Sequence, residues 1–524
     1  MREPVQPIAG RKRLRSDLVA PDAARYSGAS LRLGADVNDV VPFGVVLCLA
    51  ALTLLGAVLS NRVSEWVRVP APGIFLILSA VASDVFHGLG SLSIKVDQRI
   101  VTVALIFILF EGGMHIGWGR FRSAAGAVVW LGVVGTFLTA AALALAAQGL
   151  FGLGWRASLL IGTALAPTDP AVVFSVLGRR EVSGRSGTLL QGESGANDPV
   201  GIALMVSILG ATGGGWGDVL GGVGEFALQM AVGIAIGAIG GYVLLKVMRL
   251  PLPNEALYPV RTIAVGVLIY GVAAVCHGSG FLAVFLAGIL IGDARAPYKR
   301  EVERFAGALS SLGEIVAFTT LGLTISLHDV LHGGDLWTGL VLAALMILAV
   351  RPVCLGLLLV PIKLDLGERI FVLWSGLKGA VPILLGTFVL SEGVDHASRI
   401  YNIIFIAVTV SVVVQGGLVP TAARLLHVPM RVVEPEPWAL GLRFRDEPEG
   451  VHRYLVAPGS PADGCAIGDL AVGDTVWISI VNRGGRLIHV NGQTVLQAGD
   501  EVLALADKDS ELDGVFTRPQ QRGE

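Results

Sequence analysis

Long apolar runs recur along most of the chain and are separated by short polar segments. Each run has roughly the 20 residues that an α-helix needs to cross a bilayer. The pattern predicts an all-α polytopic membrane protein with about thirteen transmembrane spans. These spans are expected at residues 41–60, 69–87, 98–116, 123–149, 157–178, 188–210, 223–248, 258–275, 279–293, 305–326, 336–361, 370–390 and 401–423.

Lys and Arg are distributed unequally between the loops. When the loops are numbered from the first span, the odd loops carry most of the positive charge, and the even loops hold only Lys95, Arg156 and Arg399. Because cytoplasmic loops are enriched in Lys and Arg, the odd loops are predicted to be cytoplasmic. An odd number of spans then places the N-terminus outside and the C-terminal segment in the cytoplasm.

Residues 1–40 disagree with this orientation, because they carry the basic run Arg11, Lys12, Arg13 and Arg15. Two explanations fit. Either the tail is translocated despite its charge, or the true start codon lies further on and the tail is not made. We expect this segment to be disordered or mis-started, and the membrane domain to cover residues 41–427.

The composition agrees with a membrane protein, since 53% of residues are hydrophobic and only 15% are charged. The net charge of −2 gives no reason to expect a nucleic-acid partner. No metal-ligand spacing, enzyme-like catalytic constellation or cofactor motif is present, so neither an enzyme nor a resident cofactor is expected. The cysteines are interpreted as small buried hydrophobic residues: Cys48, Cys276, Cys354 and Cys465.

The character of the chain changes at about residue 428. A polar, proline-rich linker is predicted over 428–449, and a small cytoplasmic α/β or β-rich domain over 450–514. Residues 515–524 are expected to be a disordered tail. Strand-like runs occur at 475–481, 486–490, 494–497 and 501–506, and Asn491-Gly492 between two of them indicates a hairpin turn.

Polar side chains interrupt the sixth predicted span, in the stretch GESGANDPVG over residues 192–201. A charge at mid-bilayer costs at least about 2.5–3.5 kcal/mol, so each one needs a reason. Glu193 and Asn197 are four residues apart and share a helix face, and Asp198 lies about 100° further round. An N-cap cluster at a helix start is the structural alternative, but it does not explain an Asp and an Asn inside the span.

The fifth and twelfth spans contain helix-breaking residues. Pro167 and Pro170 flank Thr168 and Asp169 in the fifth span, and an unwound segment there would present free carbonyls around a carboxylate. In the twelfth span the sequence GLKGAVP, residues 376–382, places Lys378 in a similar break. We expect Lys378 to neutralise the C-terminal end of the facing half-helix; the alternative is a lysine that reaches out to the membrane surface.

These two breaks lie seven spans apart. If spans 1–6 and 8–13 are repeats, the breaks occupy matching positions, and the connecting span inverts the second copy. Paired broken helices in inverted repeats indicate a transporter site near the bilayer midplane.

Two further charges lie within predicted spans. Arg351 in the eleventh span requires an acidic partner, and we predict Glu193, as a structural ion pair. For Glu111, at the end of FILFEGG, two readings stay open: it joins the cation site or it faces the outer vestibule.

The oxygen atoms of these residues indicate a chemistry. Burial and a second nearby carboxylate both favour the neutral form of a carboxyl group. A proton or an alkali cation can then each neutralise the site, and competition between them, with alternating access, gives exchange. The hard oxygen ligands suit Na⁺ or K⁺ and are expected from Thr168, Asp169, Ser194 and Asp198.

The polar motifs together resemble those of the NhaP-type monovalent cation/proton antiporters, the branch that includes the animal sodium/proton exchangers. The resemblance covers about 41–427 and is carried, in family order, by FEGG (110–113), PTDPAVV (167–173), GESGANDPV (192–200), RP (351–352) and GLKGAVP (376–382). It implies thirteen helices, two unwound helices that cross, a homodimer and an inner (cell) membrane location.

The resemblance also implies roles for individual residues. Asp198 becomes the essential proton and cation carboxylate, with Asp169 beside it. Thr168, Ser194 and, as an open case, Glu111 become further cation ligands. Asn197 takes the helix-crossing position beside Asp198, and an Asn-Asp pair is associated with electroneutral exchange. The resemblance also makes Glu193 and Arg351 a structural ion pair, as the residues alone predict.

The chain departs from many family members at Lys378, where they have arginine. This lysine, and a tail that resembles the ligand-binding domain of potassium channel and transporter regulators (the TrkA-C or RCK_C domain), favour K⁺ as the substrate. A small anionic effector of the tail is one expectation, and a role in dimerisation only is the other. A Na⁺/H⁺ antiporter of the same fold is the alternative function; a gated K⁺ channel fits less well, because no TVGYG-like filter is present.

Overall fold

The structure is a computed structural model that describes residues 48, 51, 55, 69–86, 93–177, 180–182, 184–211, 216–432, 451–470, 472, 476–505 and 509–516. The predicted N-terminal tail, most of the first predicted span and the part of the predicted linker after residue 432 lie outside the described residues. All of the other predicted spans coincide with helices, so the prediction of an α-helical membrane domain is confirmed.

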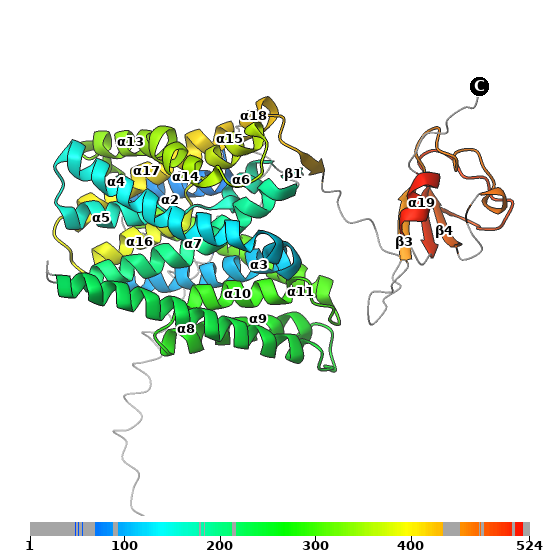
Figure 1. The fold of residues 1–524 in the computed structure, drawn as a ribbon, viewed down its shortest axis with the longest axis horizontal. Helices are drawn as coiled ribbons and strands as arrows, with labels where there is room; N and C mark the ends of the chain where they lie inside the picture. The colour runs from blue at the N-terminus through cyan, green and yellow to red at the C-terminus, as the bar shows by residue number, and fades with distance from the viewer. Residues whose placement is uncertain are drawn as a thin grey trace, which may run out of the picture.

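The helices of this domain follow the predicted order (Figure 1). From the N-terminal side they are α2 (Ala71–Val85), α3 (Ile94–Val129), α4 (Gly135–Phe151), α5 (Trp155–Leu165), α6 (Pro170–Leu177), α7 (Gly184–Gly210), α8 (Trp216–Met248) and α9 (Leu257–Val275). They continue with α10 (Gly280–Gly292), α11 (Lys299–Leu323), α12 (Leu327–His332), α13 (Leu336–Leu345), α14 (Arg351–Leu359), α15 (Leu366–Trp374), α16 (Ala380–Ser391), α17 (Ala397–Val410) and α18 (Gly416–Leu425).

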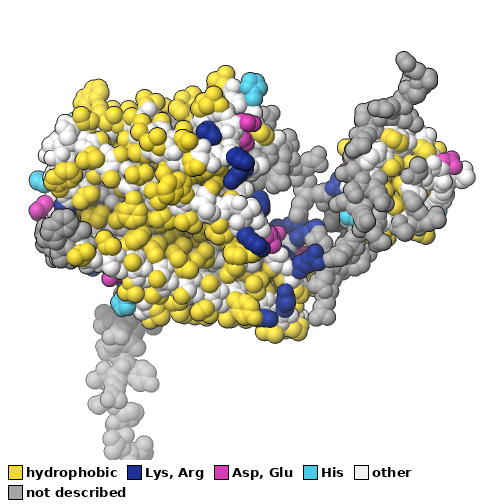
Figure 2. Space-filling model, viewed as in Figure 1, with side chains coloured by type: hydrophobic (Ala, Val, Ile, Leu, Met, Phe, Trp, Pro, Cys, Tyr) yellow, Lys and Arg dark blue, Asp and Glu magenta, His cyan; other side chains and the backbone are white. Residues whose placement is uncertain are grey.

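Among the described residues, seven helical segments are long and apolar enough to cross a membrane, and three shorter helices are apolar. Helix α7 is not among the seven, because its polar motif lowers its hydropathy. The number thirteen therefore stays a prediction. Figure 2 shows apolar side chains over the flank of the bundle, whereas Lys and Arg gather at the end where β1 and α18 lie in Figure 1.

Irregular backbone appears at matching places in the two predicted repeats. The third and fourth spans are separated at Gly117, which has φ 69° and turns the chain between two helices. In the fourth span a π-helical segment, η3 (Trp130–Val134), precedes α4, and in the eleventh η4 (Met346–Val350) precedes α14. The breaks between α5 and α6 and between α15 and α16 correspond in the same way. These paired irregularities support the interpretation of two repeats.

Helices α3 and α10 cross at glycines that let their backbones touch. A Cβ atom on Gly288 would overlap the Phe110 carbonyl oxygen, and one on Gly113 would overlap the Phe285 carbonyl oxygen. Close backbone approach at small residues is how helices pack tightly in lipid, where the solvent offers no hydrophobic driving force.

A two-stranded antiparallel sheet joins distant parts of the membrane domain. Strand β1 (Arg180–Val182) lies between α6 and α7, and β2 (Met430–Val432) follows α18. The register pairs residue 180 with 432, 181 with 431 and 182 with 430. The segment that leads toward the C-terminal domain is therefore hydrogen-bonded to the loop between two helices of the polar motif region.

The C-terminal domain is a four-stranded antiparallel sheet in the order β3-β6-β4-β5, with one helix. Its elements are β3 (Val451–Leu455), the 3-10 turn η6 (Ile467–Asp469), β4 (Trp477–Arg483), β5 (Arg486–Ile488), β6 (Glu501–Leu505) and α19 (Asp509–Phe516). The side chains of Tyr454, Val481, Val502 and Phe516 are among those that form its own buried core.

Two details of this domain differ from the sequence prediction. Strand β3 was not predicted, and the run at 494–497 contributes only an isolated bridge between Val495 and Ala466. The hairpin turn lies at Gly484-Gly485, where both residues have positive φ, rather than at Asn491-Gly492. Asn491 instead closes a local turn to Thr494. A tight hairpin turn requires positive φ at both central residues, and glycine adopts these values without a steric penalty.

An ion pair joins the partly exposed side chain of Arg483 on β4 to the buried Asp500 just before β6. Burial would raise the pKa of Asp500, but hydrogen bonds from the Arg483 side chain and the Gln497 backbone N–H outweigh it, so its pKa lies below the ordinary value. The bonds from Arg483 Nε and Nη2 measure 2.8 and 2.7 Å. This contribution to stability is present above the unfolded carboxyl pKa of about 3.9 and is lost as the pH falls below it.

The crossing of α3 and α10 makes a first prediction. Gly288→Ala should lower the thermal stability of the purified protein, because the new methyl group forces the two backbones apart at a cost of about 1–3 kcal/mol. Gly271→Ala is the matched control: it also lies within a helix, and a Cβ there meets nothing within 4 Å. It should be neutral or slightly stabilising. Equal melting temperatures for the two variants in detergent would contradict the tight crossing.

Candidate cation-binding site

The first broken helix supplies one side of the site. Helix α5 ends at Leu165, and residues 166–169 are not helical before α6 begins at Pro170. Pro167 and Pro170 lack the N–H groups that a continuous helix requires here, which explains the break. A Cβ on Gly201 of α7 would overlap the Pro167 ring, so α7 packs directly against the unwound segment.

Two side chains of α7 hold this unwound segment. Asn197 Nδ2 donates to Thr168 Oγ1 at 2.8 Å, and Thr168 N donates to Asn197 Oδ1 at 3.3 Å. Ser194 Oγ donates to the Thr168 carbonyl at 2.6 Å. All three side chains are buried. The two predicted ligands Thr168 and Ser194 are thus in direct contact, and Asn197, predicted at the helix crossing, satisfies a backbone N–H that the break leaves unpaired.

Asp169 lies where the two broken helices cross. Its Oδ1 accepts a hydrogen bond from Ala171 N at 2.8 Å and so caps α6, a role that the sequence analysis did not foresee. Its backbone N–H donates to the Leu377 carbonyl at 2.8 Å, across to the second break. A Cβ on Gly379 would overlap this carboxylate. Glycine at 379 is therefore what lets the two unwound segments approach.

Lys378 connects the second break to the first. Helix α15 ends at Trp374 and α16 begins at Ala380. Between them, Lys378 Nζ donates to the carbonyl oxygens of Ala166 and Pro167, both at 3.0 Å. The side chain is only 1% exposed. Its positive charge thus sits on the C-terminal carbonyls of α5, which is the placement that the dipole argument predicts.

Asp198 of α7 is a buried carboxylate next to the two breaks. It is 7% exposed and interacts electrostatically with Asp169 and Lys378. Within the described part of the chain, no group donates a hydrogen bond to its oxygens, whereas Asn197, Ser194, Thr168 and Asp169 are all engaged. A buried carboxylate in this position needs a proton or a cation to be stable.

A bidentate ion pair supports α7 one turn before Asn197. Arg351 Nη1 and Nη2 donate to the two oxygens of Glu193 at 2.8 and 3.2 Å, and both side chains are almost fully buried. Arg351 also donates to the carbonyls of Leu373 and Val372 near the end of α15. This one guanidinium therefore links α14, α7 and the second broken helix.

Glu111 lies apart from these contacts. It is on α3 and interacts with Ser310 of α11 and with His115. It also interacts electrostatically with Glu314, which lies four residues after Ser310 on α11 and also interacts with Asp169. Within the described residues, no hydrogen bond joins Glu111 to Thr168, Ser194 or Asp198. The structure therefore places Glu111 beside the cluster, on the α3–α11 side.

Glu314 is a candidate that the sequence analysis missed. Its Oε1 is enclosed and has no hydrogen-bond partner among the described residues. The sequence alone could have indicated it, because Glu314 is the one charged residue in the predicted span 305–326. A single carboxylate inside an apolar span is a reason to expect function.

The arrangement retains ligand capacity for a hard cation. A hydroxyl oxygen has two lone pairs, and Thr168 Oγ1 and Ser194 Oγ each keep at least one after the contacts above. Together with the carboxylates of Asp198 and Asp169 they are oxygen ligands suited to an alkali ion. The described residues contain no group of three His, Cys, Asp or Glu arranged for a resident metal.

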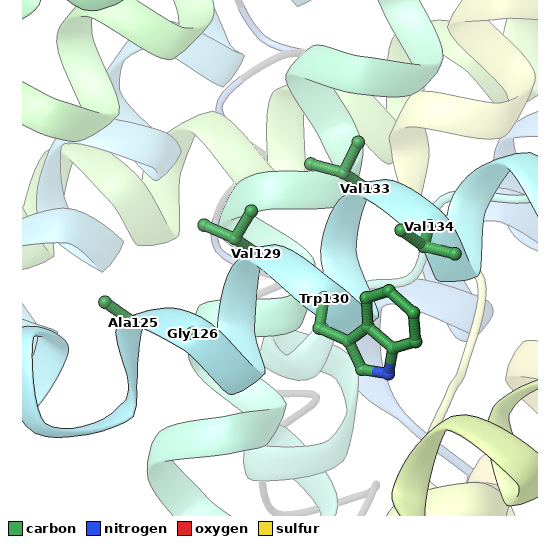
Figure 3. Close-up of a pocket in the computed structure, with 6 residues that line it drawn as sticks. All are labelled: Ala125, Gly126, Val129, Trp130, Val133 and Val134. Carbon is green, nitrogen blue, oxygen red and sulfur yellow. The ribbon is translucent and has the colours of Figure 1, made fainter.

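An apolar hollow on the surface of the helix bundle, at the fourth predicted span, is not part of this site. Its lining is apolar and comes from α3 and η3 (Figure 3): Ala125, Gly126, Val129, Trp130, Val133 and Val134. The other face of the same turn meets the motif helix, since a Cβ on Gly132 would overlap Ala196 of α7.

The Glu193–Arg351 pair makes a second prediction. Glu193→Gln should destabilise the membrane domain by about 3–5 kcal/mol, because it leaves the Arg351 charge buried without its acid. Adding Arg351→Gln should restore part of the loss by removing that charge. Glu303→Gln, which breaks the exposed pair with Lys299, is the control and should cost less than about 0.5 kcal/mol. Thermal unfolding in detergent measures all three; a Glu193→Gln protein as stable as the control would contradict the pair.

Comparisons with known proteins identify the family to which the chain belongs. Residues 49–425 match the model of the sodium/hydrogen exchanger transmembrane family, and residues 451–513 match the TrkA-C domain. The K(+)/H(+) antiporter NhaP2 of Shewanella sp. (strain MR-4) is 31% identical over 486 residues, covering 91% of this chain and 83% of the relative. The K(+)/H(+) antiporter NhaP of Alkalimonas amylolytica is 31% identical over 472 residues, covering 88% and 80%.

A solved structure has the same fold. The sodium proton antiporter MjNhaP1 of Methanocaldococcus jannaschii at pH 8 superposes with a TM-score of 0.60 at 21% identity, covering 71% of this chain and 98% of that one. At this identity the match supports the fold alone. The family match spans most of the chain, and the curated relatives exceed 30% identity over nearly all of it. The chain therefore belongs to the sodium/hydrogen exchanger family and carries a C-terminal TrkA-C domain.

Proposed function

We propose that this protein exchanges K⁺ for H⁺ across a membrane by competition at Asp198. The observation that carries the proposal is a buried carboxylate on α7 with no hydrogen-bond donor among the described residues, which interacts electrostatically with Asp169 of the first break and Lys378 of the second. The relatives named K(+)/H(+) antiporters, aligned over about nine-tenths of the chain, support the substrate pair.

The proposed cycle follows from the charge on Asp198. An ionised carboxylate that is buried without a hydrogen-bond donor is unfavourable, so either a proton or a dehydrated cation must neutralise Asp198. The cation would also draw on Thr168 Oγ1, Ser194 Oγ and Asp169. Because one carboxylate cannot serve both partners, cation entry from one side requires proton release, and alternating access makes the two movements an exchange.

One cation for one proton is the proposed stoichiometry. Asn197 occupies the position beside Asp198 and is neutral, so it contributes hydrogen bonds to Thr168 but no second titrating charge. Lys378 is committed to the Ala166 and Pro167 carbonyls, which supports a structural cation rather than a mobile one.

A Na⁺/H⁺ antiporter is the second candidate, because the solved protein with the same fold, MjNhaP1, is a sodium proton antiporter. The ligand atoms do not separate K⁺ from Na⁺, since hydroxyl and carboxylate oxygens accept both ions. Transport through the inner (cell) membrane as a homodimer, with the N-terminus outside, is proposed with the function. The concentration of Lys and Arg at one end of the bundle supports a cytoplasmic placement of that end.

We also propose that the C-terminal domain regulates transport through the β1–β2 pairing, in response to a small anionic effector. Strand β2 precedes the linker to this domain, and β1 follows the half-helix α6 that Asp169 caps. A Cβ on Gly187, at the start of α7, would overlap the Val182 carbonyl, so β1 also packs tightly on α7. A displacement of β2 would therefore be transmitted to α6, which Asp169 caps, and to α7, which carries Ser194 and Asp198.

The role of Asp198 makes a third prediction. Asp198→Asn should abolish cation-driven proton movement, because a side-chain amide neither binds nor releases a proton near neutral pH. Everted membrane vesicles with a ΔpH-sensitive dye, given KCl or NaCl, measure the exchange. Asp329→Asn, at an exposed position of α12, is the control and should behave as wild type. Exchange retained in Asp198→Asn would overturn the proposal. If the wild-type protein exchanges only Na⁺, then Na⁺ and not K⁺ is the substrate.

The β1–β2 pairing makes a fourth prediction. Two truncations, after residue 432 and after residue 429, both remove the C-terminal domain, but only the first keeps β2. We expect their apparent KM values for the cation to differ by about fivefold, the lower end of a typical coupling between sites. Vesicle assays at matched protein amounts measure the values. Identical KM values and pH profiles would show that β2 does not act on the site.

A further inference from the structure

The last membrane helix carries two polar side chains that the mechanism above does not use. Between α17 and α18 the chain forms a π-helical segment, η5 (Ser411–Gln415). Ser411 is 0% and Gln415 1% exposed. Polar groups this deep in a membrane domain are retained where they satisfy other groups, and π-helical turns occur often at functional sites.

These side chains form a relay onto the second broken helix. Ser411 Oγ accepts a hydrogen bond from the Lys378 backbone N–H at 3.1 Å and donates to Gln415 Oε1 at 2.8 Å. Gln415 Nε2 in turn donates to the Trp374 carbonyl, at the end of α15. One backbone donor and one backbone acceptor of the break are thus satisfied from a single helix turn.

The first break is held in an equivalent way. Asn197 of α7 accepts from the backbone N–H of Thr168 and donates to its hydroxyl. In the two predicted repeats the sixth span, α7, corresponds to the thirteenth, which contains η5. Each break is therefore held by the last helix of its own repeat. Asn197 holds a break that bears Asp169, and the Ser411–Gln415 relay holds the one that bears Lys378.

We propose that Ser411 and Gln415 are positioning residues for cation binding. They fix the backbone of Lys378, whose Nζ lies on the carbonyls of Ala166 and Pro167, directly before Thr168 and Asp169. Through this contact the relay sets the position of the oxygens that would surround the cation beside Asp198. The inference rests on the proposed exchange at Asp198, and it assigns the relay to cation affinity rather than to proton transfer.

The test compares three variants of the full-length protein in the vesicle assay, with K⁺ and with Na⁺ as the probe cation. Gln415→Leu removes both amide contacts, and Ser411→Ala removes one hydroxyl. Thr409→Val is the matched control on the same helix, because its buried hydroxyl has no hydrogen-bond partner among the described residues. Thermal unfolding in detergent establishes that each variant is folded.

We expect Ser411→Ala and Gln415→Leu to raise the apparent KM for the cation by about tenfold, the effect of losing roughly one net hydrogen bond. The rate at saturating cation should fall less than about twofold, and Thr409→Val should match wild type in both. A merely structural relay would lower the amount of active protein and leave KM unchanged. If Gln415→Leu does not fold, Ser411→Ala carries the test alone, since it removes a single oxygen.

An unchanged cation KM in folded Ser411→Ala protein would overturn the inference. That outcome is distinguishable from failure of the proposed function. If Asp198→Asn is inactive while the relay variants keep the wild-type KM, exchange at Asp198 stands and only the positioning role is wrong. If Asp198→Asn still exchanges, the proposed function fails whatever the relay variants do.

Discussion

Two helices are interrupted inside the hydrocarbon region, and their unpaired backbone groups constrain everything around them. In lipid an unsatisfied N–H or C=O costs several kcal/mol, so such breaks persist only where protein groups take the place of the helical bonds. Here each break partly satisfies the other: the Asp169 N–H donates to the Leu377 carbonyl, and Lys378 Nζ donates to the carbonyls of Ala166 and Pro167. At the crossing, each broken helix therefore provides hydrogen bonds for backbone groups that the break in the other leaves unpaired.

The remaining groups are satisfied by helices that pack on the crossing. Asn197 and Ser194 of α7 hold the first break, and Ser411 and Gln415 of η5 hold the second. The Glu193–Arg351 pair then fixes α7 to α14 and reaches the end of α15. After these contacts the carboxylate of Asp198 is left without a donor among the described residues. A polar framework around an uncommitted carboxylate is what the proposed exchange requires, because the transported ion would supply the missing interaction.

Much of this organisation was predictable from local patterns. The broken spans follow from Pro167, Pro170 and Gly379, since proline and glycine disturb a helix wherever they occur. Arg351 in the eleventh predicted span required an acid, and Glu193 in the polar sixth span was the acid predicted to supply it. The C-terminal domain was less predictable: the strand at Val451–Leu455 and the Gly484-Gly485 hairpin were missed, because short half-buried strands and alternative turn signals depend on which partner the chain finds. Glu314 was overlooked although its position in an apolar span was visible.

The sequence by itself determined the membrane class, the positions of both breaks and the small set of charges inside the predicted spans, because the cost of breaking a helix or burying a charge in lipid hardly depends on the rest of the fold. Only the tertiary structure decided which groups meet. The bonds from Asn197 to Thr168, from Gln415 to Trp374 and from Lys378 to Ala166 join residues far apart in the chain, and so does the pairing of β1 with β2. No local pattern encodes such contacts, since they arise from how the helices pack, and that packing leaves Asp198 without a hydrogen-bond donor among the described residues while its polar neighbours are engaged.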